Sequence, residues 1–277
     1  PLALSGGCGA SGAAASFEGC GAHPVTGCAR GRWRAAGATG ACGCATLRGM
    51  PRRLASLCLI AVLALPAAAQ APFRLAPALA FDVSRSVDAA DHAIEVDGIR
   101  AALTDPEIVL ALLGPANPVA LAVYEWSGPR QPVVVLPWTV VRGTGDLDAI
   151  LARLAAHRRD PVPGVTALGE ALAFGRALID RAPNCAGRVI DVWGDGRNNA
   201  GADPCSVYAR GDWGGITVNG LAIGGHETDI AASYAAEVIR GPGAFVEVAR
   251  THRDFPPAIR RKLLRELTEP VFGALSP

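Results

Sequence analysis

The sequence predicts an α/β fold with three layers, in which helices cover both faces of a doubly wound, mostly parallel sheet with one antiparallel edge strand. From residue 77 onward, short runs rich in β-branched residues alternate with longer segments of helical period, and this alternation is typical of such a sheet. Two of the short runs are separated by a turn that contains Ser127-Gly128-Pro129. This turn predicts a hairpin, and therefore one antiparallel strand.

The expected strands are the short apolar runs that end in polar or glycine-containing loops. The first ends in the loop Ser84-Arg85-Ser86, and the fourth ends in Gly194-Asp195-Gly196. In chain order, the expected strands are Ala78 to Val83, Pro118 to Trp126, Val133 to Val141, Arg188 to Trp193, Ile216 to Ile223 and Ala244 to Val248.

The expected helices are the longer segments in which apolar residues recur with helical period. The segment Pro161-Val162-Pro163-Gly164 breaks the chain before the longest helix, and Pro183 ends that helix, because proline lacks the amide hydrogen that a helix interior needs. In chain order, the expected helices are Asp91 to Leu103, Asp146 to His157, about Ala167 to Arg181, Pro204 to Trp213, Asp229 to Val238 and about Pro256 to Leu267.

The first 69 residues differ in composition from the rest of the chain. Residues 1–49 are dominated by Gly, Ala and Cys without apolar periodicity, and we interpret them as disordered upstream sequence, translated from a start assigned too early. Met50, the only methionine, precedes two arginines and the apolar run Leu54 to Leu65. This pattern predicts a signal peptide over residues 50–69, with cleavage after Ala69 or, as a second choice, after Ala71.

Residues 70–277 would then form one exported domain, periplasmic or secreted. An uncleaved anchor is the alternative, but the apolar run is short for a bilayer, so we expect no membrane span in the mature form. Without residues 1–69 the chain has 20 basic and 24 acidic side chains. This net charge of −4 gives no reason to expect binding to nucleic acid or to lipid.

Two of the eight cysteines, Cys185 and Cys205, lie beyond residue 69. Cysteines of exported proteins are commonly paired, so we expect a disulfide between these two. The alternative is two separate buried thiols.

Side chains that carry oxygen occur at three places that the predicted fold brings to one edge of the sheet. They follow the first strand, precede the longest helix and follow the fourth strand, and loops at the carboxyl ends of parallel strands gather along one edge. Residues more than 100 positions apart are therefore expected to meet there. These residues are Asp82, Ser84, Ser86, Thr166 and Asp195.

Carboxylate and hydroxyl oxygens without His or Cys are the ligands of a hard cation such as Mg²⁺, with Mn²⁺ or Ca²⁺ as alternatives. Two carboxylates and three hydroxyls leave one of six positions for an outside ligand. Two formal negative charges also leave the ion electrophilic enough to attract a third carboxylate. We therefore expect a protein partner that presents an acidic side chain.

These five residues resemble the metal-ion-dependent adhesion site of von Willebrand factor A (vWA) domains, whose pattern is Asp-x-Ser-x-Ser, then Thr, then Asp. The resemblance implies the Rossmann-like vWA fold and direct ligation by Ser84 and Ser86, with Asp82 and Asp195 bound partly through water. Trp193 departs from the pattern, because a small residue is commoner there, and its ring could narrow access to the ion.

The chain is also similar to a narrower bacterial family of exported vWA-like domains of unknown function, DUF1194, from about Leu75 to Glu269. Four segments carry this similarity, namely Glu125-Trp126-Ser127-Gly128-Pro129, Gly194-Asp195-Gly196-Arg197-Asn198-Asn199, Gly241-Pro242-Gly243-Ala244-Phe245 and Ala258-Ile259-Arg260-Arg261-Lys262-Leu263.

The function predicted from these residues is a cation-dependent protein-binding module rather than an enzyme. A Mg²⁺-dependent hydrolase or phosphotransferase is the alternative, because α/β sheets with an Asp after the first strand also serve phosphoryl chemistry. Against it, the sequence has no Gly-rich phosphate loop and no convincing general base beside the site. A purely structural metal is a third possibility.

The remaining polar residues have simpler interpretations. Ser84, Ser86, Asp88 and Thr166 would also serve as helix N-caps, and Asn198-Asn199 as a turn. Glu125 is expected to be solvated or paired. Solvated surface positions are expected for two further groups, His92, His157, His226 and His252, and Arg260, Arg261, Lys262 and Arg265.

Overall fold

A computed structural model describes residues 73–159 and 164–268 of the chain. The upstream segment, the predicted signal peptide and most of the predicted break at 161–164 lie outside these residues. Within the described ranges, no helix combines the length and the apolar character needed to cross a membrane.

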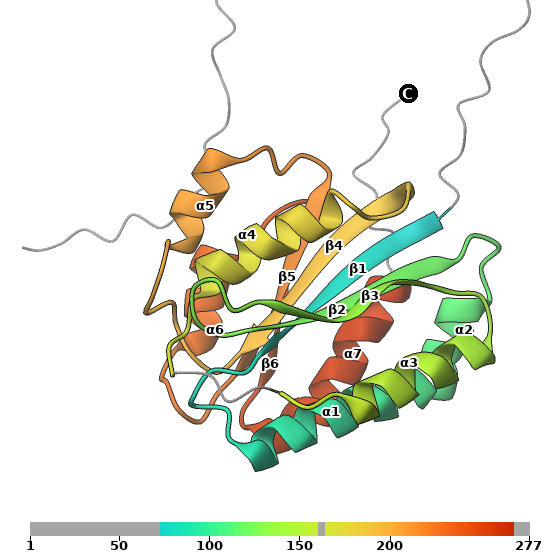
Figure 1. Cartoon of the computed structure of the whole chain (residues 1–277), viewed down its shortest axis with the longest axis horizontal. Coiled ribbons are helices and arrows are strands. Elements are labelled where there is room, and N and C mark those ends of the chain that lie inside the picture. Colours follow the sequence, from blue (N-terminus) through green and yellow to red (C-terminus); the bar gives the residue numbers. More distant parts are fainter. Residues whose placement is uncertain (1–72, 160–163, 269–277) are drawn as a thin grey trace, which may run out of the picture. The chain divides into compact units, whose positions relative to one another are not determined.

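The described residues contain a six-stranded sheet in the order β3-β2-β1-β4-β5-β6, which Figure 1 shows. All neighbouring strands are parallel except β2 and β3, which form the expected antiparallel pair at one edge. The predicted fold class is therefore confirmed. The strands are β1 (Phe73–Asp82), β2 (Val119–Trp126), β3 (Val133–Val141), β4 (Cys185–Gly194), β5 (Ile216–Ile223) and β6 (Val246–Ala249).

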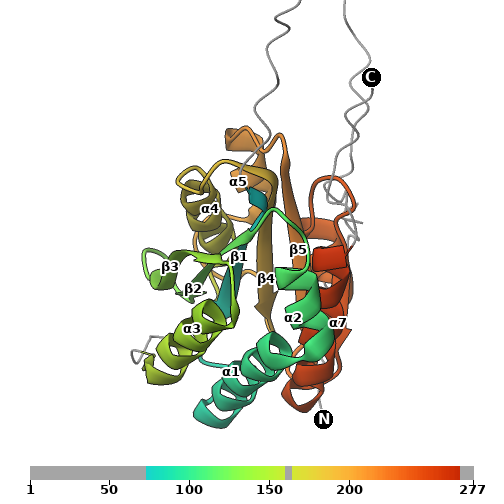
Figure 2. The same cartoon turned by 90° about the vertical axis from the view of Figure 1, so that its right-hand side faces the viewer.

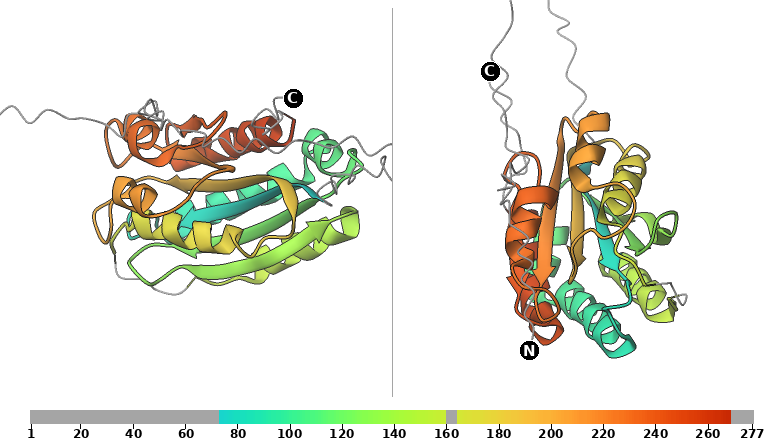
Figure 3. Two further views of the ribbon diagram at one scale, coloured as in Figure 1. Left: turned by 90° about the horizontal axis from the view of Figure 1, so that it is seen from above. Right: turned by 90° about the vertical axis from the view of Figure 1, so that its left-hand side faces the viewer.

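Helices cover both faces of the sheet, with one apolar core on each side (Figures 2 and 3). One face carries α1 (Ala89–Thr104), α2 (Pro106–Leu113), α3 (Thr144–Ala156) and α7 (Phe255–Thr268). The other face carries α4 (Leu168–Ile179), α5 (Pro204–Arg210), α6 (Ile230–Ser233) and the π-helix η1 (Tyr234–Val238). A short 3₁₀ turn, η2 (His252–Asp254), leads into α7.

Alternation along the central strands sends successive side chains to opposite cores. Leu79 and Phe81 of β1 belong to the core under α1 and α7, whereas Ala78 and Ala80 belong to the core under α4. Because the side-chain period of a strand is two, Asp82 at the end of β1 points toward the α4 side. This direction decides which residues surround its carboxylate.

The strands and helices differ from the sequence prediction at several ends. β1 begins at Phe73 rather than Ala78, and the helix expected over Asp229 to Val238 is divided into α6 and η1. Helix α2 was not predicted. Its signal is nevertheless present, because Asp105 accepts hydrogen bonds from two amides at its start and Pro106 occupies the first turn, the combination that begins many helices.

The predicted Cys185–Cys205 disulfide is wrong, because Cys185 has a free, buried thiol. Cys185 is the first residue of β4. Cys205 lies in the first turn of α5, close after Ala202, which packs against Gly169 at the start of α4. Cys185 lies at the amino end of β4, whereas the chain reaches α5 from the carboxyl end of that strand, so the two cysteines are approached from opposite ends of β4.

Candidate metal centre

The loop after β1 turns sharply and buries its polar side chains. The backbone amide of Ser84 donates to Asp82 Oδ1 at 2.7 Å, and the amide of Val87 donates to the Ser84 carbonyl at 3.1 Å. Asp82 is completely buried and Ser84 is 1% exposed. The loop therefore holds the carboxylate and the first serine in fixed positions at the carboxyl edge of the sheet.

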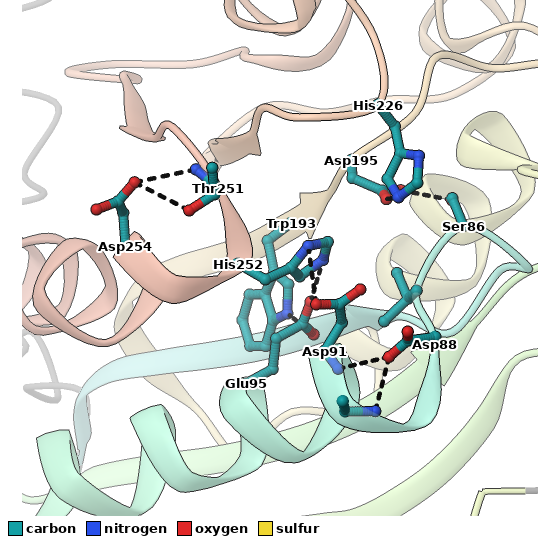
Figure 4. A network of polar contacts seen from close by, with 12 residues as sticks. Ser86, Asp88, Asp91, Glu95, Trp193, Asp195, His226, Thr251, His252 and Asp254 are labelled. Carbon is teal, nitrogen blue, oxygen red and sulfur yellow. Dashed lines mark hydrogen bonds and ion pairs between the residues drawn. The ribbon is translucent and has the colours of Figure 1, made fainter.

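Ser86 connects this loop to the end of β4. Its hydroxyl donates to Asp195 Oδ1 at 2.6 Å and lies 3.2 Å from the Ser84 hydroxyl. Figure 4 shows the contact between Ser86 and Asp195. Asp195 is fully buried, so residues 109 positions apart meet as the predicted sheet edge requires.

Thr166 lies beside the loop that follows β4 and carries Asp195. A Cβ added to Gly196 would be 3.3 Å from Thr166 Oγ1, which places the threonine hydroxyl next to the residue that follows Asp195. The Thr166 amide donates to Asn199 Oδ1 at 2.7 Å, and the Asn199 amide donates to the Thr166 carbonyl at 2.9 Å. The structure thus brings together all three stretches that the sequence singled out.

The asparagine pair does more than form a turn. The Asn199 side chain accepts a hydrogen bond from the Thr166 amide. Asn198 Oδ1 accepts one from the amide of Gly169, in the first turn of α4, at 3.2 Å. Together, the two side chains hold the start of α4 against the loop after β4.

Helix capping does not account for the hydroxyl residues. Asp88 is the N-cap of α1 and accepts from the amides of Ala90 and Asp91, and Ala167 occupies the N-cap position of α4. The capping alternative therefore holds for Asp88 but not for Ser84, Ser86 or Thr166, whose hydroxyl groups remain available for another role.

The two carboxylates at this edge have little to balance their charge. Neither Asp82 Oδ2 nor Asp195 Oδ2 accepts a hydrogen bond from the described residues. Burial raises the pKa of Asp82 to about 8, and the negative charge of Asp195 adds to this effect, whereas the bond from the Ser84 amide opposes it. The nearest basic group to Asp195 is the half-exposed His226, whose Nε2 lies 3.7 Å from Oδ2.

This donor set fits a hard divalent cation. Buried carboxylate oxygens without partners are costly unless a cation or a donor satisfies them, and a 2+ ion restores the ionised form that burial disfavours. Only two of the five side chains are carboxylates, the other three being hydroxyls. No group of three or more His, Cys, Asp or Glu residues with metal-binding geometry occurs within 73–159 and 164–268.

Trp193 does not cover the site. Its ring is fully buried in the core under α1 and α7, with centroids 4.3 Å from Phe81 and 5.7 Å from Phe255. Its Nε1 donates to Glu95 Oε2 at 3.2 Å. Figure 4 shows the indole below Asp195 and directed toward α1. The ring therefore packs beneath the end of β4 and does not narrow access to the candidate metal centre.

Two residues near the centre were missed by sequence reasoning. The hydroxyl of Tyr234 is buried and lies next to Asp82, since a Cβ on Gly194 would be 2.9 Å from the hydroxyl and 2.6 Å from Asp82 Oδ2. His226 lies beside Asp195. Neither belongs to a recognisable motif, because both follow β5 and only the sheet order brings them close.

Three of the four histidines beyond residue 69 are not the solvated surface residues that the sequence suggested. His92 Nε2 and His157 Nε2 bind the two oxygens of Glu125 at 3.1 and 2.8 Å, and these bonds outweigh burial and lower the pKa of Glu125. His252 is 7% exposed and its Nε2 lies 3.2 Å from Glu95 Oε1. Each histidine therefore balances a buried carboxylate.

Lys262 also contradicts the prediction of a solvated helix face. It is fully buried, and its Nζ contacts both Asp191 and Glu266. Burial lowers the pKa of this amine, but the two negative charges outweigh burial and raise it. Arg260 and Arg261 do lie at the surface, where they pair with Asp105 and Glu247.

Comparison with known proteins gives a family and a fold. The sequence pattern of the family described as "Protein of unknown function (DUF1194)" matches residues 72–271. No curated relative matches the chain.

Solved structures share the fold at low identity. Proximal thread matrix protein 1 from the mussel byssus matches with a TM-score of 0.53 and 14% identity over 70% of this chain and 48% of that chain. The von Willebrand factor type A protein from Catenulispora acidiphila matches with a TM-score of 0.50 and 16% identity, over 70% of this chain and 43% of that chain. The pilus adhesin SpaC from Lactobacillus rhamnosus GG matches with a TM-score of 0.50 and 13% identity, over 70% of this chain and 30% of that chain. The chain thus spans half or less of each of these proteins and has the vWA fold.

Proposed function

We propose that this chain, which belongs to the DUF1194 family of proteins of unknown function, is a protein-binding module that holds a divalent cation and captures an acidic side chain of its partner through that ion. The residues that would hold the cation are Asp82, Ser84, Ser86, Thr166 and Asp195. Mg²⁺ is the ion that this set of oxygens suits best, with Mn²⁺ or Ca²⁺ as alternatives.

One observation carries the proposal. Asp82 and Asp195 are fully buried, each has an oxygen without a hydrogen-bond partner among the described residues, and both lie beside serine or threonine hydroxyls. Nearby buried acids such as Glu125 and Glu95 have a histidine partner in close contact. A bound cation would supply the missing positive charge.

The chemistry that the cation supplies is a Lewis-acidic position for an oxygen ligand from outside. With two carboxylates around a 2+ ion, a third carboxylate is electrostatically favoured. The chain's own residues orient the hydroxyls and shield the site from water, because Asp82, Ser84, Thr166 and Asp195 are all buried. The side near the half-exposed His226 is the proposed approach for the partner.

The fold is compatible with this role. One protein of similar fold is a pilus adhesin, and the partner of the present chain is proposed by analogy to be another exported or surface protein. Export itself rests on the predicted signal peptide over residues 50–69. Nothing among the described residues favours a catalytic role over this one.

The metal-binding half of the proposal is tested by thermal unfolding of the purified protein with Mg²⁺ and with EDTA. Mg²⁺ at 100 times its dissociation constant should stabilise the protein by about 2.7 kcal/mol, and Asp82→Ala should abolish the response while the metal-free protein still unfolds cooperatively. Arg181→Ala, an exposed change at the end of α4, is the matched control. A response of Asp82→Ala equal to that of the unaltered protein would reject the site.

The ligand-binding half is tested on a surface that carries a peptide with a single Glu, beside one with Gln in its place. Binding should require both Mg²⁺ and the Glu peptide, and EDTA should release the protein. Equal binding to the two peptides would overturn the proposed recognition of a carboxylate. Magnesium-dependent turnover of a phosphate ester in the same preparations would favour a hydrolase instead.

A further inference from the structure

Tyr234 has a buried hydroxyl that nothing in the fold explains. The side chain is fully buried in the core beneath α4, and its hydroxyl has no hydrogen-bond partner within the described ranges. Buried tyrosine hydroxyls normally find a partner. A tyrosine hydroxyl is protonated at neutral pH and can donate a hydrogen bond.

The hydroxyl is directed at the candidate metal centre. A Cβ added to Gly194 would lie 2.6 Å from Asp82 Oδ2 and 2.9 Å from the Tyr234 hydroxyl. The two oxygens therefore flank the same glycine, although they form no hydrogen bond with each other. Any side chain at residue 194 would push these two oxygens apart, which explains why a glycine occupies this position.

The backbone holds the ring in this position. Tyr234 opens the π-helix η1, in which the Ile239 amide donates to the Tyr234 carbonyl at 3.1 Å. A Cβ on Gly220 of β5 would lie 2.8 Å from Tyr234 Cδ1, so this strand also leaves room for the ring. Single turns of π-helix are uncommon and occur frequently at functional sites. Two glycines and an unusual helical turn thus place one phenol beside Asp82.

We propose that Tyr234 is a positioning residue of the cation site, whose hydroxyl donates to a water molecule that Asp82 Oδ2 also holds in the shell of the bound ion. The inference rests on the proposed function, because it assigns a role to a residue that would act through Asp82 and not on the partner. Outer groups of this kind orient the ligands of metal sites, and their loss commonly weakens metal affinity 10- to 100-fold. A polar gap too long for a direct hydrogen bond is the geometry that one bridging water fills.

The test compares Tyr234→Phe with Tyr208→Phe. Both changes remove one buried hydroxyl from the same core, but Tyr208 donates to the carbonyl of Val238, the last residue of η1. Calorimetric titration with MgCl₂ should show a 10- to 100-fold weaker affinity for Tyr234→Phe and an unchanged affinity for Tyr208→Phe. The metal-free melting temperature should be unchanged or higher for Tyr234→Phe and lower for Tyr208→Phe.

A second readout separates positioning from packing. The chain has three tyrosines, so ring-labelled tyrosine resonances are few enough to assign by substitution. Mg²⁺ should shift the Tyr234 resonance in the unaltered protein and in Tyr208→Phe. An unaltered protein that binds Mg²⁺, together with an equal affinity in Tyr234→Phe, would overturn this inference and leave the proposed function standing. An unaltered protein that binds no Mg²⁺ would overturn both.

Discussion

Two groups of buried carboxylates at the carboxyl half of β4 are satisfied in opposite ways. Asp191, inside the strand, faces α7, where Lys262 contacts both it and Glu266. Asp195, four positions further along the chain, receives a hydrogen bond from the Ser86 hydroxyl and has no lysine or arginine partner among the described residues. Both aspartates are fully buried.

The contrast shows where the chain supplies its own counter-charge and where it leaves one out. The group under α7 carries its own cation, because Lys262 contacts both acids, and the side-chain amide of Asn219 donates to Glu266 Oε1 at 2.6 Å. The group at the sheet edge is open, since hydroxyls and one amide orient the acids without neutralising them. We therefore expect the loss of Lys262 to lower the free energy of unfolding through the first group. We expect the addition of a cation to raise it through the second group.

The largest effect is expected from Lys262→Met, which keeps the length of the side chain and removes its charge. Asp191 and Glu266 would then remain buried without their cation, and breaking such a pair typically costs about 3–5 kcal/mol. Urea unfolding measures the loss, which Mg²⁺ should not restore.

Arg261→Met is the control for this substitution, because Arg261 pairs with Glu247 at the surface, where such pairs contribute about 0–1 kcal/mol. A loss below 1 kcal/mol for Lys262→Met would show that the group under α7 does not depend on its lysine.

The next effect concerns the open group. Asp195→Asn should remove the Mg²⁺-dependent stabilisation of about 2.7 kcal/mol expected at 100 times the dissociation constant. The metal-free variant should be at least as stable as the unaltered protein, because a buried carboxylate without a counter-charge is replaced by a neutral group. Paired urea titrations in Mg²⁺ and in EDTA test this, and a metal-free loss as large as that of Lys262→Met would erase the distinction between the two groups.

A smaller effect, dependent on pH, is expected from His252. Burial lowers its pKa, but the hydrogen bond and charge of Glu95 and the charge of Asp91 outweigh burial and raise the pKa above 6.5. A raised pKa in the folded state means that the contribution to stability is complete below pH 6.5 and is lost as pH rises through the folded value. His252→Gln should therefore cost about 2 kcal/mol at pH 6, and less as pH increases.

Unfolding free energies from pH 6 to 9 in EDTA measure this dependence. His226→Gln serves as the control, because His226 is half exposed and its loss should leave metal-free stability unchanged. A cost of His252→Gln that is constant over this range would mean that the ring acts by packing and not by charge.

The sequence was informative wherever a pattern is local. The strands and the hairpin turn could be recognised from short stretches of sequence. The five residues at strand ends could be grouped because the carboxyl ends of parallel strands share one edge of the sheet. The errors arose where distant residues decide the environment. Lys262 is buried, contrary to the predicted solvated position, because it pairs with Asp191, which is 71 positions away. Tyr234 carries no signal in the sequence, because only the neighbouring strands bring it to Asp82.

Two of the wrong or missing predictions could have been avoided from local sequence alone. Lys262 lies three positions after Ile259 and one before Leu263, two buried residues, so the helical period already placed it on the apolar face. Asp105-Pro106 marks the start of α2. The cysteine prediction failed for another reason, since it relied on the export compartment and not on where the fold places the two residues.

The smallest effect is expected at the loop that carries Thr166, and it asks how firmly the open group is held. Asn199→Ala removes the acceptor of the Thr166 amide but keeps the backbone bond from residue 199 to the Thr166 carbonyl, so the loss of stability should be about 1 kcal/mol. Asn198→Ala removes a similar bond, to Gly169, and is the matched control. Because Thr166 is a proposed ligand and Gly169 is not, Mg²⁺ titration should show a weaker affinity, by about tenfold, for Asn199→Ala alone. If both variants lost affinity equally, the position of α4 as a whole, and not the Thr166 loop, would determine cation binding.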